Sequence, residues 1–334
     1  MKRLGLALLG VLALAAHSAA AAPKCEVDRP IIFAGMDWAS NSFHNAVAGF
    51  ILEKGFGCKV DSIPGSTIPL LTGLGRGDVD IAMEVWKDNV TEPWNKALAA
   101  GKVVELGTNF PDAIQGWYVP RYLVEGAGAK APDLRHVRDL VKYKALFRDP
   151  EEPSKGRFYN CILGWNCEII NTKKLKVYGL DKHFTNFRPG TGAALAAAIA
   201  SNYMRAKPFV AYYWGPTWVM GKFDLVMLEE PPHNAADWKA LGAEKNPKKA
   251  VAYPLVEVIV GVNAAFRNQA PKLVEFLTLY DTSNAQISDA LSYMQETKGA
   301  TEKDAALRFL KQMTKYWSQW VPADVAARVR AALR

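Results

Sequence analysis

The residues of this chain best suited to chemistry lie in a short loop between two cysteines, Cys161-Ile-Leu-Gly-Trp165-Asn-Cys167. We name residues 161–167 the Cys loop. A disulfide bond across it would fix the ring of Trp165, and the residues that follow predict the start of a helix. Because the first N–H groups of a helix have no partner inside it, they offer hydrogen-bond donors beside an aromatic face. That combination suits a ligand with an apolar cation and an anionic tail. A structural hairpin whose tryptophan covers the disulfide explains the loop equally well at this point.

The first third of the chain predicts three parallel strands that would bring more such residues together. Buried strands are expected at residues 31–33, 60–63 and 79–85, with helices at 42–54 and 65–74. Alternating strands and helices are typical of a parallel sheet, in which ligands bind beyond the carboxyl ends of the strands. The residues at these ends are Asp37, Trp38, Gly65, Ser66, Thr67, Glu84 and Trp86.

The second half of the chain follows the same rule. A strand at residues 209–213 ends at Trp214, after an Ala-rich helix expected at 191–204, and Trp165 lies where another helix begins. An extended run at residues 253–262 is expected to cross back to the first half. These patterns predict an α/β protein of two lobes with a ligand site between them.

The N-terminus has the features of a secretory signal peptide over residues 1–22. Basic residues at 2–3 precede an apolar run through residue 16 and small residues at 18–22. That run is too short to span a bilayer, and charges or prolines interrupt every later one. We therefore expect a soluble mature chain in the periplasm. The remaining length of about 310 residues favours two domains.

All four cysteines lie in the expected mature chain, where an oxidising compartment favours disulfide bonds. Four cysteines allow three connectivities. Sequence position favours Cys25 with Cys58, each just before an expected strand, and Cys161 with Cys167. The spacing in the Cys loop does not match the Cys-x-x-Cys motif of disulfide oxidoreductases.

Composition and motifs argue against several other classes of protein. The formal net charge is +8, but the basic residues are scattered, so we expect no nucleic-acid partner. The five histidines share no metal-ligand spacing, so neither a metal nor a cofactor is expected. No catalytic nucleophile, carboxylate pair or phosphate-binding loop stands out, and we do not expect an enzyme.

Three motifs occur in the order and at the spacing of a known family. They are the segment 79–86 ending in Trp86, the Cys loop followed by Glu168, and Trp214-x-Pro216-x-Trp218 preceded by Tyr212-Tyr213. Together they resemble the substrate-binding protein of the glycine betaine and proline betaine ABC importer, over essentially the whole mature chain. The resemblance implies a bilobed type II periplasmic binding protein, with two doubly wound α/β lobes joined by a two-segment hinge.

The resemblance also implies a division of the chain and a set of partners. One lobe would hold residues 23–117 and 254–334, and the other residues 118–253. The protein would be a monomer that captures a methylated ammonium osmolyte, with glycine betaine first, and delivers it to inner-membrane permease subunits. Choline, carnitine and trimethylamine N-oxide are alternative ligands. A ligand-sensing domain and a secreted enzyme acting on choline derivatives are alternative classes.

Residue roles follow from the same resemblance. In that family the tryptophans matching Trp86, Trp165 and Trp214 form a box around the trimethylammonium group. The backbone N–H groups matching Asn166 and Cys167 receive the carboxylate. A quaternary ammonium has no N–H to donate, so aromatic faces are the chemistry that can recognise it.

Two positions depart from the family pattern. Val90 stands where the compared family member has a histidine that helps to bind the carboxylate. Asn166 stands where that member has a glycine after the loop tryptophan. Both departures concern the anionic tail of the ligand and not the cation box.

Further candidates for the site lie at strand ends, in the first helix and at the first crossover, where Gln115 and Trp117 alternate and are both expected to line the cleft. Trp38 and Trp117 are candidate aromatic walls, and Asp37, Glu84 and His44 are candidate polar partners. A carboxylate in the cleft would attract a cation and oppose the carboxylate of a betaine. Such a charge would favour choline or an amine oxide.

Overall fold

The computed structural model describes residues 23–89 and 92–334, so the expected signal peptide lies outside the described residues. Within them, one sheet has the strand order β2-β1-β3-β9-β4-β7-β5-β6, and β8 pairs with β4. The strands are β1 (Ile31–Met36), β2 (Val60–Gly65), β3 (Ile81–Trp86), β4 (Val103–Pro120), β5 (Gly156–Tyr159), β6 (Phe184–Phe187), β7 (Val210–Gly215), β8 (Leu225–Met227) and β9 (Val256–Asn263).

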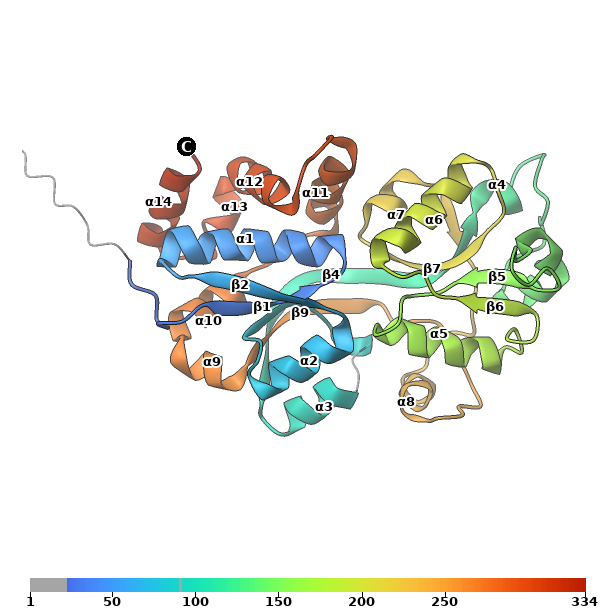
Figure 1. Cartoon of the computed structure of the whole chain (residues 1–334), viewed down its shortest axis with the longest axis horizontal. Coiled ribbons are helices and arrows are strands. Elements are labelled where there is room, and N and C mark those ends of the chain that lie inside the picture. Colours follow the sequence, from blue (N-terminus) through green and yellow to red (C-terminus); the bar gives the residue numbers. More distant parts are fainter. Residues whose placement is uncertain (1–22, 90–91) are drawn as a thin grey trace, which may run out of the picture.

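Helices cover both faces of this sheet (Figure 1). They are α1 (Ala39–Phe56), α2 (Thr67–Arg76), α3 (Glu92–Ala99), α4 (Arg121–Val124), α5 (Asn166–Val177), α6 (Gly192–Met204), α7 (Trp218–Lys222), α8 (Ala235–Ala243), α9 (Ala264–Gln269), α10 (Pro271–Leu279), α11 (Asn284–Glu296), α12 (Glu302–Gln312), α13 (Thr314–Trp317) and α14 (Ala323–Ala332). Short 3₁₀ helices lie at Lys87–Asn89 and Val137–Phe147. Among the described helices, none combines the length and apolar character needed to cross a membrane.

Lobe A consists of strands β2, β1, β3 and β9 and the first part of β4, with the helices that cover them. Strand β1 pairs in parallel with β2 and β3, as the sequence predicts, and β9 runs antiparallel to β3. Residues Phe43, Val47 and Ile51 recur every four positions of α1 and are fully buried, because this spacing places them on one helix face. Figure 1 shows α1 and α11 to α14 on one side of the sheet, and α2, α3 and α9 on the other.

The second half of the sheet forms lobe B. Strand β5 pairs in parallel with β6 and β7, and β7 runs antiparallel to β4. A separate hydrophobic core, which includes Trp117, Phe158 and Phe209, fills this lobe. Figure 1 shows α6 and α7 over one face of its sheet and α5 and α8 over the other. Each lobe therefore has its own core.

Strand β4 belongs to both lobes. It pairs with β9 from Val103 to Ala113 and with β7 from Ile114 to Tyr118. The chain returns to lobe A just before β9. The expected boundaries at 117/118 and 253/254 stay predictions, since a strand shared by two lobes has no single dividing residue.

Both expected disulfide bonds are present. Cys25 is bonded to Cys58 with Cα atoms 4.8 Å apart, and Cys161 to Cys167 with Cα atoms 6.0 Å apart. The first bond ties the start of the described chain to a position two residues before β2. The second closes the Cys loop, which leads directly into α5. Cys167 itself lies in the first turn of that helix.

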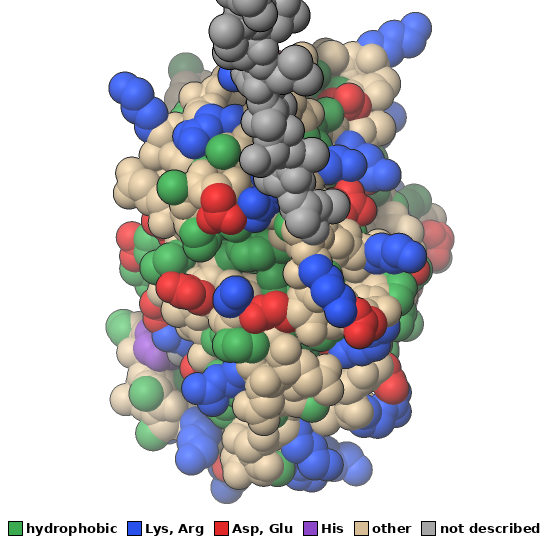
Figure 2. All heavy atoms as spheres, turned by 90° about the vertical axis from the view of Figure 1, so that its left-hand side faces the viewer, with side chains coloured by type: hydrophobic (Ala, Val, Ile, Leu, Met, Phe, Trp, Pro, Cys, Tyr) green, Lys and Arg blue, Asp and Glu red, His purple; other side chains and the backbone are tan. Residues whose placement is uncertain are grey.

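The outer end of lobe A carries charges of both signs. In Figure 2, Lys and Arg side chains alternate with Asp and Glu side chains across this face. Ion pairs in lobe A include Arg76 with Asp78 and Arg328 with Asp324. This face agrees with the expectation that the basic residues are scattered.

Candidate ligand-binding site

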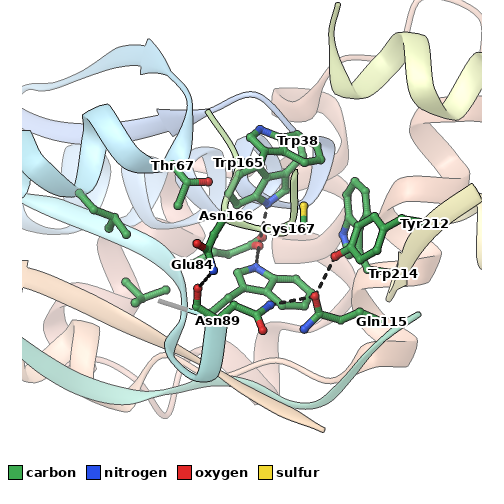
Figure 3. A pocket seen from close by; sticks show the side chains of 13 residues that line it. Trp38, Thr67, Glu84, Asn89, Gln115, Trp165, Asn166, Cys167, Tyr212 and Trp214 are labelled. Atoms are coloured by element: carbon green, nitrogen blue, oxygen red, sulfur yellow. Dashed lines mark hydrogen bonds between the residues drawn. The ribbon is translucent and has the colours of Figure 1, made fainter. Parts of the chain in front are cut away.

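A pocket between the two lobes brings most of the expected site residues together (Figure 3). Lobe A contributes the ends of β1 and β3 and the start of α2, while lobe B contributes the Cys loop and the end of β7. The lining residues are Trp38, Thr67, Leu71, Glu84, Val85, Trp86, Asn89, Gln115, Trp165, Asn166, Cys167, Tyr212 and Trp214.

Glu84 holds two of the tryptophans. Its Oε2 accepts a hydrogen bond from the indole N–H of Trp38 at 2.8 Å and one from that of Trp86 at 3.1 Å. Trp38 follows β1 and Trp86 ends β3, and these neighbouring parallel strands finish at the same edge. One carboxyl group thus fixes the direction of two rings from separate parts of lobe A.

The other two tryptophans come from lobe B and continue the aromatic wall. The ring of Trp165 meets Trp38 edge-on, with centroids 5.4 Å apart, and meets Trp214 edge-on at 5.2 Å. The indole N–H of Trp165 donates to Oδ1 of Asp37 in lobe A at 2.6 Å. Asp37 therefore acts on the wall through Trp165 and is not itself among the residues that line this pocket.

Gln115 contributes polar groups to the pocket from β4, the strand that passes between the lobes. Gln115 accepts hydrogen bonds at Oε1 from the side-chain amide of Asn89 at 2.8 Å and from the hydroxyl of Tyr212 at 2.7 Å. Its Nε2 is buried and has no hydrogen-bond partner. This amide is a donor available to an acceptor inside the pocket.

The start of α5 supplies further donors. The helix begins at Asn166, and its N-cap residue Trp165 makes no side-chain cap, so the first N–H groups keep their positive character toward the pocket. The side-chain amide of Asn166 donates to the backbone carbonyl of Asn89, across the two lobes. Val90, the position of the missing histidine, lies outside the described residues.

The Cys loop also touches lobe A through its backbone. The N–H of Ile68 donates to the carbonyl of Gly164 at 3.2 Å. Gly164 has φ of 91°, and a Cβ there would lie 2.3 Å from Oγ of Ser66. A glycine is thus required both by the backbone conformation and by the close approach of the lobes.

Burial controls the charges next to the pocket. It raises the pKa of Glu84 to about 7, although hydrogen bonds from Ser40, Trp38 and Trp86 act in the opposite direction. Burial lowers the pKa of His44 to about 3, so this imidazole is neutral. Its Nε2 lies 3.8 Å from Oε1 of Glu84, and its Nδ1 is 2.8 Å from the hydroxyl of Tyr280.

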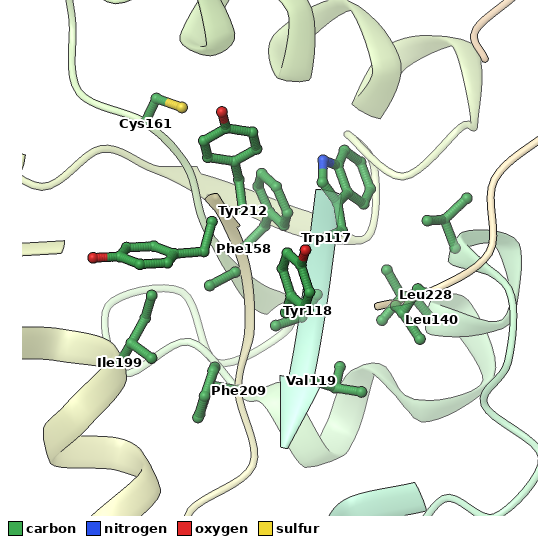
Figure 4. Packing of buried hydrophobic residues seen from close by; sticks show 14 of the residues in the cluster. Trp117, Tyr118, Val119, Leu140, Phe158, Cys161, Ile199, Phe209, Tyr212 and Leu228 are labelled. Carbon is green, nitrogen blue, oxygen red and sulfur yellow. The ribbon is translucent and has the colours of Figure 1, made fainter. Parts of the chain in front are cut away.

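Two expected site residues lie elsewhere. Trp117 is fully buried in the core of lobe B (Figure 4), and its indole N–H donates to Asn171 at 2.7 Å. It shares a face of β4 with Gln115 but lies two residues farther into lobe B, where α5 covers that face. His44 is fully buried behind Glu84 and does not line the pocket.

Tyr212 and Asn89 line the pocket without having been expected there. Tyr212 precedes Trp214 by two residues on β7, and that alternation was the signal that could have found it. Asn89 follows β3 in a 3₁₀ turn, for which the sequence carried no such signal. Within residues 23–89 and 92–334, no group of three or more His, Cys, Asp or Glu side chains could hold a metal ion.

Comparison with known proteins gives one family match. The profile for the substrate-binding domain of the ABC-type glycine betaine transport system matches residues 29–312. The glycine betaine/proline betaine-binding periplasmic protein of Salmonella typhimurium is 22% identical over 266 residues, which cover 77% of this chain and 78% of that protein. OusX, a glycine betaine-binding periplasmic protein of Dickeya dadantii, is 24% identical over 168 residues, 48% of each chain.

Solved structures share the fold. ProX from Borrelia burgdorferi has a TM-score of 0.72 at 17% identity and covers 90% of this chain and 100% of its own. A choline-binding ABC-transporter protein in complex with choline has a TM-score of 0.73 at 17% identity, covering 91% and 98%. Lactococcal OpuAC with glycine betaine has a TM-score of 0.69 at 18% identity, covering 88% and 100%. These matches confirm the predicted bilobed fold of a type II periplasmic binding protein.

Proposed function

The chain belongs to the family of substrate-binding domains of ABC-type glycine betaine transport systems, and from this premise we propose the ligand and the site. The ligand is a quaternary or otherwise methylated ammonium compound, with glycine betaine first and choline, carnitine and trimethylamine N-oxide as alternatives. It binds between the lobes, with its cation among Trp38, Trp86, Trp165 and Trp214. Because the family is one of binding domains, the chain is a binding protein and not an enzyme.

The observation that carries this proposal is the arrangement of four tryptophans from both lobes around one pocket. A trimethylammonium group offers no hydrogen-bond donor, whereas the ring quadrupole attracts its charge and its methyl groups pack on the rings. Each contact contributes about 0.5–2 kcal/mol once desolvated. Several together approach the roughly 8 kcal/mol of a micromolar dissociation constant.

The polar end of the ligand has two sets of donors in the same pocket. The first N–H groups of α5, at Asn166 and Cys167, lie at the positive end of the helix dipole. The unpartnered Nε2 of Gln115 lies on β4. These groups suit a carboxylate, a hydroxyl or an amine oxide oxygen.

Delivery of the ligand follows from the family and from the two-lobed shape. The two relatives from Salmonella typhimurium and Dickeya dadantii are periplasmic proteins. We propose that this protein is also periplasmic and that its partners are the permease subunits of an ABC importer. Walls from both lobes make occupancy and lobe closure interdependent, so a membrane partner can recognise the loaded form by its shape.

Calorimetric titration with glycine betaine, proline betaine, choline, carnitine and trimethylamine N-oxide tests the proposal. Trp165→Ala should weaken every ligand that binds by at least about 1 kcal/mol, because it removes one ring of the wall. Trp238→Ala is the matched control, since this half-buried tryptophan lies outside the pocket and contacts residues of lobe B. Equal affinities for the wild type and Trp165→Ala would remove Trp165 from the site.

A further inference from the structure

Glu84 is a buried carboxyl group with an unusual set of partners. Its side chain is fully buried, and it lines the pocket. Oε2 accepts hydrogen bonds from two indole N–H groups, Ser40 adds a hydrogen bond to the carboxyl, and Oε1 lies 3.8 Å from Nε2 of the neutral His44. A buried carboxylate that only stabilised the fold would be expected to pair with a cation.

In the part of the chain that the structure describes, the groups that face Glu84 do not supply a compensating positive charge. Helix α1 contributes Ser40 and the neutral imidazole of His44, and the residue after α10 contributes the hydroxyl of Tyr280, which contacts that imidazole. The segment after β1 contributes Trp38 next to Asp37, whose carboxyl accepts from Trp165. These neighbours leave the cationic partner of Glu84 to come from the pocket.

We propose that Glu84 has two linked roles in ligand binding, as the positioning residue of Trp38 and Trp86 and as the negative charge that attracts the ligand cation. The proposal rests on the proposed function, since it assigns a role within the same pocket. When Glu84 is ionised, its oxygens attract both the indole N–H groups and the ligand cation. When it is protonated, the acceptor remains but the charge is lost.

This dual role predicts a pH dependence that the ligand cannot produce. A quaternary ammonium such as choline does not titrate, so any change in its affinity between pH 5.5 and 8.5 comes from the protein. Because the pKa of Glu84 is raised to about 7, the carboxyl is mostly protonated at the lower pH and ionised at the higher one. We expect choline to bind at least about fivefold more weakly at pH 5.5 than at pH 8.5.

Three proteins separate the two roles, with choline titrated into each by calorimetry at both pH values. Glu84→Gln keeps an acceptor oxygen for the indole groups and removes the charge, so its affinity should be weaker at pH 8.5 and independent of pH. Glu84→Leu keeps neither, so its affinity should be lower still, with a shift in tryptophan fluorescence. Glu105→Gln, an exposed carboxyl on β4, is the control and should keep the wild-type profile.

The outcomes distinguish this proposal from the one on which it rests. If Glu84→Gln keeps both the affinity and the pH profile of the wild type, the role of Glu84 is wrong while the proposed function stands. If the wild type binds none of the methylated ammonium compounds at either pH, the proposed function itself fails. If Glu84→Leu does not fold, the isosteric Glu84→Gln still decides the role of the charge.

Discussion

Lobe B contains a second site built from aromatic rings and a carboxyl group, and it differs from the cleft in what fills it. The ammonium group of Lys174 lies 3.9 Å from the ring centroid of Tyr253 and 5.7 Å from that of Trp238. It pairs with Glu230 at 2.7 Å and is fully buried. All of these residues belong to lobe B, so the protein provides its own cation there.

In the cleft, no residue within 23–89 and 92–334 is shown to supply the equivalent cation to Glu84. The carboxyl group of Glu84 accepts from two indoles instead of from an ammonium. Its partners are spread over lobe A, and the rest of the aromatic wall comes from lobe B. The internal site is therefore complete in one lobe, whereas the cleft is complete only when the lobes meet and a cation arrives.

Burial disfavours the charged form of the titratable group in both sites, but the result differs between the two sites. It lowers the pKa of Lys174 and raises that of Glu84, because desolvation disfavours either charge. In the internal site the two charges offset each other. In the cleft no described residue offsets the charge of Glu84, which leaves electrostatic free energy to be gained on binding.

The largest expected effect is on stability, from breaking the internal site. Lys174→Met leaves Glu230 buried without its cation, so we expect the free energy of unfolding to fall by about 3–5 kcal/mol. The affinity for choline should not change. Urea denaturation measures the first quantity and calorimetry the second.

A matched control for this test is the neighbouring residue. Lys173 donates to the backbone carbonyls of Leu241 and Gly242, so Lys173→Met leaves no buried carboxylate behind. A loss below about 1 kcal/mol in Lys174→Met, the range of an exposed pair, would contradict the comparison.

Removing the charge of Glu84 from the cleft should instead stabilise the ligand-free protein at high pH. Glu84 has a usual pKa of 4.5, and in the folded protein its pKa is raised to about 7. Between these values the folded state holds a proton that the unfolded state has released, so the contribution of Glu84 to the stability of the ligand-free protein falls as pH rises through this window. The loss amounts to about 3 kcal/mol, and Glu84→Gln should not suffer it. The lowered pKa of His44 contributes a change of the opposite sign, which the wild type and Glu84→Gln share.

Urea denaturation of the ligand-free wild type and Glu84→Gln at pH 5 and pH 8 measures this difference. The variant should gain stability over the wild type at pH 8 relative to pH 5. The same change with pH in both proteins would mean that Glu84 carries no unpaired charge, and the contrast with Lys174 would be lost.

The smallest expected effect is on choline affinity. It depends on the contact between the two lobes, which only the cleft site requires. A Cβ on Gly164 meets Ser66 of the other lobe, so Gly164→Ala should weaken choline binding by roughly tenfold, or about 1.4 kcal/mol. Gly126→Ala is the control, because Gly126 also has a positive φ, 88°, but no atom near the position of a Cβ. Equal affinities in the two variants would assign the effect to backbone strain and not to lobe contact.

The sequence carried much of the framework because its signals were local. The strands β1 to β3, the helix periodicity of α1 and the two disulfide pairs each depend on neighbouring residues or on the order of elements. The positions of Trp86, Trp165 and Trp214 followed from motif order. These features need no knowledge of how distant segments pack.

The contacts that the sequence could not supply are those between distant segments. Trp38 and Glu84 are 46 positions apart, and their hydrogen bond forms because the ends of β1 and β3 finish at one edge. Trp117 shares the strand face of Gln115, and only the placement of α5 over β4 decides that one is core and the other lines the pocket. His44 was expected near the pocket, but the end of β3 lies between its side chain and the pocket.

Strand β4 has a consequence for engineering this protein as a biosensor. Because one continuous strand forms part of the sheet in both lobes, an inserted reporter domain or a new chain terminus between Val103 and Pro120 would remove ladder hydrogen bonds on both sides. The loop with Gly126 and Gly128 has open space around both residues. Circular permutation or reporter insertion should therefore be tolerated there and not in the crossing strand.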